Sequence, residues 1–171
     1  MLTMNNDFRL RAQRLLVAVL ACFSLAVGCG AGEVPAEYQG FFVLPSSQQH
    51  SVLAKEPLEK QIDIYVFAVE NFRPSAYGFG FSDDIAANGR GAVPVLIARL
   101  RSDPNESHRW ALIHVFRDMV KFHYDFRNET DAVQVLTEVV GSMKGSFYRK
   151  DSENLLNEVV SMPERVAPQQ P

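Results

Sequence analysis

Four histidines are the side chains of this sequence best suited to proton transfer or metal binding: His50, His108, His114 and His123. On a helix, the six-residue spacing between His108 and His114 puts the two rings on different faces. The four-residue histidine spacing of helical zinc motifs is absent. Because a metal site in a protein needs three or four converging ligands, this spacing predicts no metal site. No cofactor is expected either.

The sequence carries no motif for nucleophilic catalysis or phosphate binding. No serine lies in a Gly-x-Ser-x-Gly elbow, and no Lys-Ser/Thr pair follows a glycine-rich loop. The neighbouring acids Asp83 and Asp84 follow Ser82, which is typical of the first turn of a helix, where carboxylates are favourable. An enzyme would need one of these acids to converge with His114 or His123 across the fold. We therefore predict a non-enzymatic protein.

Three aromatic residues alternate with glycines just before these acids: Tyr77, Phe79 and Phe81. In an extended segment the three rings would share one side, and an exposed set of rings is a typical platform for a partner. The alternative is a loop whose rings fill the core, because large apolar side chains are usually buried. Tyr77, Phe79, Phe81, Asp83 and Asp84 are the predicted partner-binding residues.

The N-terminal segment has the order of a secretory signal. Three arginines precede an apolar stretch from Leu15 to Val27. This stretch of about 13 residues is shorter than the roughly 20 that cross a bilayer as a helix. A basic head, a short apolar body and small residues at its end predict a cleaved signal peptide over residues 1–28. The alternative is an uncleaved anchor in which Cys29 is an ordinary residue.

The end of this segment, Leu25-Ala26-Val27-Gly28-Cys29, resembles the lipobox of bacterial lipoproteins. The resemblance implies cleavage before Cys29 and a diacylglycerol on its thiol, usually with a further acyl chain. Two or three chains on one residue give lasting membrane attachment, whereas one chain is marginal. Gly30 follows the cysteine, whereas Asp at that place retains lipoproteins of enteric bacteria in the inner membrane. The resemblance therefore implies a lipid anchor in a bacterial membrane, at the outer membrane facing the periplasm where the source has two membranes.

Removal of residues 1–28 would leave 14 Lys+Arg against 19 Asp+Glu, a formal charge of −5. A domain of this charge, without a basic run longer than two residues, does not attract nucleic acid. Cys22 would leave with the signal, so Cys29 would be the only cysteine and no intrachain disulfide could form. The membrane, through the lipid on Cys29, and an envelope protein of unknown identity are the expected partners.

Two composition changes divide the remaining chain. Residues 29–54 are rich in Gly, Pro, Ser and Gln, which predicts a tether and an irregular lead-in behind the lipidated cysteine. Within it, Phe41–Leu44 is too apolar for a linker and predicts a short extended segment packed on the domain, or else a docking segment for a partner. Residues 164–171 are predicted to be a disordered tail.

Between these regions, apolar residues recur at helical spacing. The pattern predicts a mostly α domain of five to six helices over residues 55–163. The expected helices cover about residues 57–73, 82–88, 93–103, 107–123, 128–140 and 151–162.

The stretch Ile85–Leu100 resembles one unit of the HEAT-type helical repeats. The match is carried by a run that opens the second helix of such a unit, namely Gly89, Gly91, Ala92, Val93, Pro94, Leu96, Ile97 and Leu100. The resemblance implies stacked helical pairs that bind protein by a helical face, because one amphipathic pair cannot bury its apolar side alone. An unrelated compact helical bundle is the alternative.

We therefore expect a membrane-anchored envelope lipoprotein whose helical domain is a non-enzymatic interaction or assembly module. Two alternatives remain open. An envelope enzyme requires a polar cleft in which distant acids and histidines converge. A carrier of a hydrophobic ligand requires an apolar cavity lined by the aromatic residues.

Overall fold

The computed structural model of this chain describes residues 33–72, 76–129 and 131–164, and within these ranges it contains helices and turns but no strand. This confirms the all-α class. The predicted signal peptide, the lipobox with Cys29 and residues 165–171 of the predicted tail lie outside the described residues. None of the described helices is long and apolar enough to cross a membrane.

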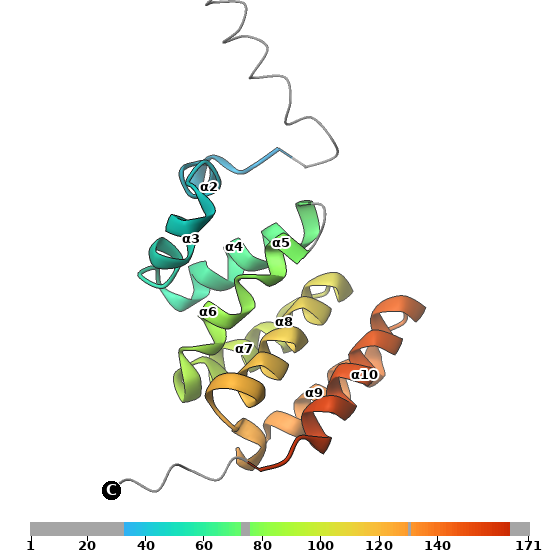
Figure 1. Cartoon of the computed structure of the whole chain (residues 1–171). Helices are drawn as coiled ribbons and strands as arrows, with labels where there is room; N and C mark the ends of the chain where they lie inside the picture. The colour runs from blue at the N-terminus through green and yellow to red at the C-terminus, as the bar shows by residue number, and fades with distance from the viewer. Residues whose placement is uncertain (1–32, 73–75, 130, 165–171) are drawn as a thin grey trace, which may run out of the picture. The chain divides into compact units, whose positions relative to one another are not determined.

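The described residues form more helices than the five to six predicted (Figure 1). The α-helices are α2 (Ala36–Phe42), α3 (Ser46–Leu53), α4 (Leu58–Asn71), α5 (Ala76–Phe79), α6 (Ser82–Ala86), α7 (Ala92–Ser102), α8 (Glu106–Asp118), α9 (Ala132–Ser142) and α10 (Ser146–Ser161). Short 3-10 helices cover Gly89–Gly91 and Phe126–Asn128, and a π-helical turn, Met119–His123, extends α8.

The two additional helices at the start, α2 and α3, occupy the region predicted to be a tether with an extended segment. The predicted tether and extended conformation are wrong over Ala36–Leu53, because these residues form two packed helices. The expected packing of the Phe41–Leu44 segment on the domain agrees with Phe41, which is 7% exposed, and Leu53 of α3 is fully buried as well. Prolines, which lack the N–H that a first turn leaves unpaired, precede both helices at Pro35 and Pro45. The folded part of the chain therefore begins at least 19 residues earlier than the predicted boundary at residue 55.

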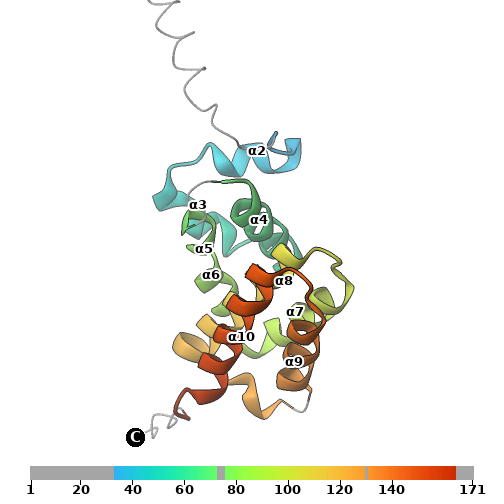
Figure 2. The same cartoon turned by 90° about the vertical axis from the view of Figure 1, so that its right-hand side faces the viewer.

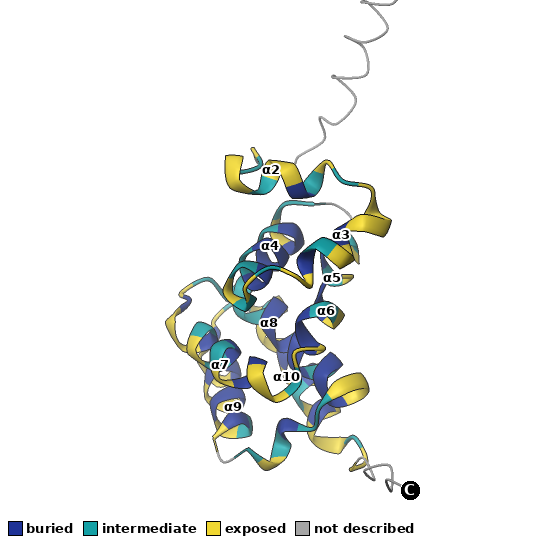
Figure 3. Cartoon of the chain, turned by 90° about the vertical axis from the view of Figure 1, so that its left-hand side faces the viewer, coloured by how far each residue is buried: buried dark blue, intermediate teal, exposed yellow. Residues whose placement is uncertain are grey.

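The helices from α4 onward form two layers (Figures 1 and 2). One layer contains α4, α7 and α9, and the other contains α6, α8 and α10, with neighbouring helices in contact within each layer. Contacts of α4 with α5 and α6, of α7 with α8 and of α9 with α10 join the layers, so helices that follow one another in sequence form pairs. Helix α8 contacts α4, α6, α7 and α10, and buried residues gather along α4 and α8 (Figure 3).

Helix α5 packs so closely on α4 that only glycine fits at the contact. A Cβ atom on Gly78 would lie 2.5 Å from the backbone nitrogen of Val69 and 2.7 Å from the carbonyl carbon of Ala68. The extended segment predicted for Tyr77–Phe81 is therefore replaced by a helical turn, followed directly by α6. The rings of Tyr77 and Phe81 contact each other at 5.5 Å, whereas Phe79 packs against Trp110 and His114.

The ends of α8 and α10 are set by polar contacts. Asn105 accepts a hydrogen bond from the Ser107 N–H at 2.9 Å and caps α8. Helix α10 begins at Ser146, whereas the sequence predicted a start at residue 151. The Glu106 carboxylate of α8 accepts hydrogen bonds from the N–H groups of Lys144 and Gly145, which holds the turn before α10.

Candidate functional site

The three predicted platform rings lie largely inside the fold. Phe81 is 2% exposed and packs against Phe41 at 5.5 Å between ring centroids. Phe79 packs against Trp110 and His114 at 5.1 and 4.3 Å. The exposed platform predicted for Phe81 is therefore wrong, and the alternative, in which rings fill the core, describes this residue.

Tyr77 joins the start of the fold to its body. Its hydroxyl donates a 2.7 Å hydrogen bond to Oε1 of Gln49, a residue of α3 that is only 2% exposed. Partial burial raises the pKa of Tyr77 above its ordinary value. This hydroxyl is thus engaged within the fold and keeps its proton at neutral pH.

The acids Asp83 and Asp84 lie in the first turn of α6, as predicted, and each also faces a histidine from another part of the chain. His123 Nε2 lies 2.6 Å from Asp83 Oδ1, and His50 Nδ1 lies 2.6 Å from Asp84 Oδ2. Burial holds the pKa of Asp84 above its ordinary value, against the opposing effect of the hydrogen bond from His50. The two pairs connect α6 to α3 on one side and to the π-helical turn on the other.

Catalysis would require Asp83 or Asp84 to lie beside His114 or His123. The structure brings Asp83 and His123 together, but neither acid contacts His114. His114 lies between the rings of Phe79 and Trp110, and its Nε2 has no hydrogen-bond partner among the described residues. Burial, with a smaller contribution from the Arg117 charge, lowers the pKa of His114 to about 4. This ring is therefore neutral at pH 7 and serves as a packing group.

Neither acid-bound histidine has a serine, threonine or cysteine within hydrogen-bonding distance in the described part of the chain. Within the same ranges, no three His, Cys, Asp or Glu side chains converge as metal ligands. His50 and His123 are thus paired with carboxylates, and no described residue provides a nucleophile beside them.

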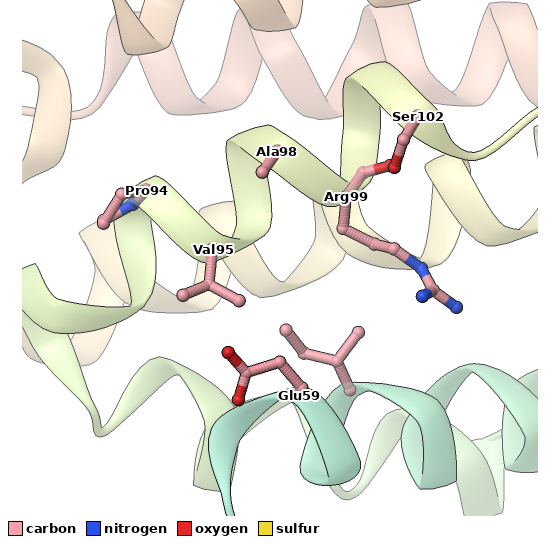
Figure 4. A pocket seen from close by; sticks show the side chains of 7 residues that line it. Glu59, Pro94, Val95, Ala98, Arg99 and Ser102 are labelled. Atoms are coloured by element: carbon pink, nitrogen blue, oxygen red, sulfur yellow. The ribbon is translucent and has the colours of Figure 1, made fainter.

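A groove with a volume of about 530 Å3 lies between α4 and α7. Ile62, Pro94, Val95 and Ala98 provide apolar lining, and Glu59, Arg99 and Ser102 add polar groups. Figure 4 shows Glu59 of α4 and Val95 of α7 facing each other across the groove. The Arg99 side chain extends toward α4 farther along α7.

The two charged groups of this groove differ in how they are paired. Arg99 lies 2.9 Å from Asp63 and 3.3 Å from Asp103, which offset its charge. Glu59 is exposed and forms no ion pair or hydrogen bond with another described residue. The groove therefore offers an apolar surface beside an unpaired negative charge, which suits an apolar side chain with a cation next to it.

A second hollow of about 390 Å3 lies on the other side of α7, against α9. Arg90, Arg101, Glu129 and Asp131 surround its smaller apolar part, and Arg90 pairs with Glu129 at 3.0 Å. Pro94 borders both hollows. The outward side of α7 is thus a ridge between two depressions.

This groove was not predicted from the sequence. Its visible signal was that Val95 and Ala98 lie off the stripe of Val93, Leu96 and Leu100, which packs into the fold. That signal shows a partly apolar outer side of α7, but the hollow also depends on α4, a separate helix.

No protein-family model matches the chain, and no curated protein and no solved structure is significantly similar to it. What the fold establishes is an all-α protein.

Proposed function

We propose that this protein is a lipoprotein of the bacterial envelope whose helical body is a non-enzymatic interaction module. The lipobox resemblance supports a diacylated Cys29 and an outer membrane location facing the periplasm where two membranes exist. The helical body binds an envelope protein through the α4–α7 groove. The single observation that carries this role is the groove itself, which combines an apolar lining with the unpaired carboxylate of Glu59.

The arrangement of the helices supports the HEAT-like interpretation of the body. Three consecutive pairs, α4 with α5–α6, α7 with α8 and α9 with α10, stack side by side in two layers. Pro94 lies in the first turn of α7, at the place that the HEAT resemblance assigns to it. Stacked pairs of this kind leave one helical layer open to a partner.

The anchor is tested by labelling with palmitate in a bacterial host, beside a Cys29→Ala variant. We expect label and membrane association in the unchanged protein and loss of both in the variant. Unlabelled protein in both cases would overturn the anchor and leave Cys29 an ordinary residue.

The groove is tested with a photo-crosslinking amino acid placed in intact cells at position 95 and, as a matched control, at the exposed position 154 of α10. We expect a discrete adduct with an envelope protein from position 95 only. Glu59→Lys should reduce this adduct, because it replaces the unpaired negative charge with a positive one. Equal crosslinking from both positions, or no effect of Glu59→Lys, would argue against the groove.

An envelope enzyme is the second candidate, favoured by the 2.6 Å contact between Asp83 and His123. Its weakness is the lack of a nucleophile beside this pair in the described residues. A screen with chromogenic esters and amides, using Asp83→Asn as the control, tests it. Hydrolysis that Asp83→Asn abolishes would support an enzyme.

A carrier of hydrophobic ligands finds less support. The aromatic side chains that would line its cavity pack on one another, as in the contacts of Phe42 with Phe67 and Phe72. Neither described hollow is lined by an aromatic residue.

A further inference from the structure

The surface of α2 and α3 differs from the rest of the chain in its charge. Residues 38–54 contain no Asp, Glu, Lys or Arg, although 22% of all residues in the chain are charged. The stretch holds two titratable rings: His50 is paired with Asp84, and burial raises the pKa of Tyr38, which stays neutral at pH 7. The nearest charged residues along the chain are Glu37, an exposed residue in the first turn of α2, and Lys55, which follows α3.

This uncharged surface also carries an exposed apolar side chain. Val43, directly after α2, is 80% exposed, more than any other large hydrophobic residue in the described ranges. Its exposed neighbours are uncharged: Gly40 precedes it, and Pro45 and Ser46 follow. Figure 3 shows that most of α2 is exposed.

Helices α2 and α3 are nevertheless fixed to the body. Tyr38 contacts Phe67 of α4 at 5.7 Å, and Phe41 contacts Phe81 at 5.5 Å between ring centroids. Gln49 accepts the hydrogen bond from Tyr77. Val43 is therefore exposed although the helix that precedes it is packed on the body.

The chain length between the proposed anchor and α2 is short. Six residues separate Cys29 from Ala36, so fully extended backbone spans at most about 25 Å between the two Cα atoms. Val43 lies roughly 11 Å farther along the helix. On the proposed function, α2 therefore lies close to the bilayer that holds the acyl chains, because the short link sets a much smaller maximum distance than the tether predicted over residues 29–54.

We infer that the α2–α3 surface around Val43 rests against the lipid headgroups of the membrane that carries Cys29. The uncharged part of this surface, residues 38–54, has little desolvation cost on entering the interfacial region, whereas Glu37 at the start of α2 must stay in water. The acyl chains provide the affinity, since one exposed valine adds little. The contact of Val43 instead fixes the orientation of the body, with α2 and α3 toward the lipid. This inference rests on the proposed anchor.

The test uses the full chain, palmitate-labelled in a bacterial host and reconstituted in phosphatidylcholine vesicles. Val43→Cys introduces the only free thiol of the mature acylated chain, and an environment-sensitive dye is attached to it. Val160→Cys on α10 is the matched control, because Val160 is also an exposed valine, at 55%. We expect the dye at position 43 to emit at shorter wavelength and to lose intensity when the lipid chains are brominated, and the dye at position 160 to do neither.

The other outcomes separate the two proposals. Palmitate incorporation with equal, unquenched emission at both positions would overturn the membrane contact and leave the anchor standing. A shift at position 43 without quenching by brominated lipid would mean that protein covers Val43, which also overturns the contact. Absence of palmitate would remove the anchor, and the inference with it.

Discussion

Replacement of Gly78 by alanine tests whether α5 and α4 touch through backbone as closely as the structure has them. The added Cβ would lie 2.5 Å from the Val69 nitrogen and 2.7 Å from both the Ala68 carbonyl carbon and the Val69 Cα. These are backbone atoms within a 14-residue helix, so they cannot move aside as the end of a flexible side chain would. Helix α5 must therefore shift as a unit.

The expected loss follows from the nature of this clash. Overpacking a close contact costs about 1–3 kcal/mol, and occasionally more. Backbone strain at position 78 does not add to this cost, because among the described glycines only Gly89 has a positive φ. Gly141→Ala in α9 is the matched control, since a Cβ there meets nothing within 4 Å. It should be neutral or raise stability by up to about 1 kcal/mol, because alanine is the better helix former.

The assay is urea unfolding of residues 30–171, produced without the signal segment and followed by far-ultraviolet circular dichroism. With a slope of about 2 kcal/mol per molar urea, Gly78→Ala should lower the unfolding midpoint by about 0.5–1.5 M. Gly141→Ala should leave the midpoint unchanged or raise it. Equal midpoints for the two variants would refute the close approach of α5 to α4.

Three further outcomes are expected from the same unfolding assay. Burial lowers the pKa of His114 from 6.5 to about 4. As the pH falls, the unfolded chain therefore binds a proton at this ring that the folded protein does not, and the free energy of unfolding decreases by about 2 kcal/mol between pH 7 and 4.5. His114→Phe should remove this part of the pH dependence. The hydrogen bonds from Lys144 and Gly145 lower the pKa of Glu106. The ionised Glu106 therefore stabilises the fold above pH 4.5, and this stabilisation is lost as the pH falls through the lowered pKa. The difference in unfolding free energy between the unchanged protein and Glu106→Gln should accordingly disappear in acid. Phe81→Ala should cost about 3–5 kcal/mol as a buried aromatic truncation, whereas Phe147→Ala, at a side chain 64% exposed, should stay within about 0.5 kcal/mol.

The parts of the fold that the sequence predicted well are encoded locally. Helices α4, α7 and α8 follow apolar residues at helical spacing, and Pro57, Pro94 and Asn105 lie at or near their starts. Such signals need no knowledge of the neighbouring helices. These three helices accordingly lie close to their predicted ranges.

Helices α2 and α3 were missed because their stability comes from distant contacts. Isolated helices of seven and eight residues are marginal in water. Their formation depends on burial of Phe41 and Leu53 and on the hydrogen bond between Gln49 and Tyr77. A Pro- and Ser-rich composition with little periodicity is also typical of a linker, so composition could not separate the two.

The candidate site was harder still to predict, since it consists of relations between helices. The sequence marked Asp83 and Asp84 correctly as first-turn residues, but the partner of Asp84, His50, lies 34 positions away. The sequence left the Phe81 ring as a candidate for exposure, whereas in the fold this ring is buried against Phe41 and Tyr77. Burial of this kind is decided by packing, which no local pattern records.

The two proposed contact surfaces of this protein lie on different elements and share no residue. The uncharged surface around Val43 belongs to α2 and α3, whereas the groove beside Glu59 belongs to α4 and α7. The short link from the anchor to α2 also limits where the groove can lie. If the body rests on lipid through α2 and α3, the groove stays near the membrane surface and is accessible to a partner located there. The proposed partner should accordingly be sought among proteins that are held at the same membrane.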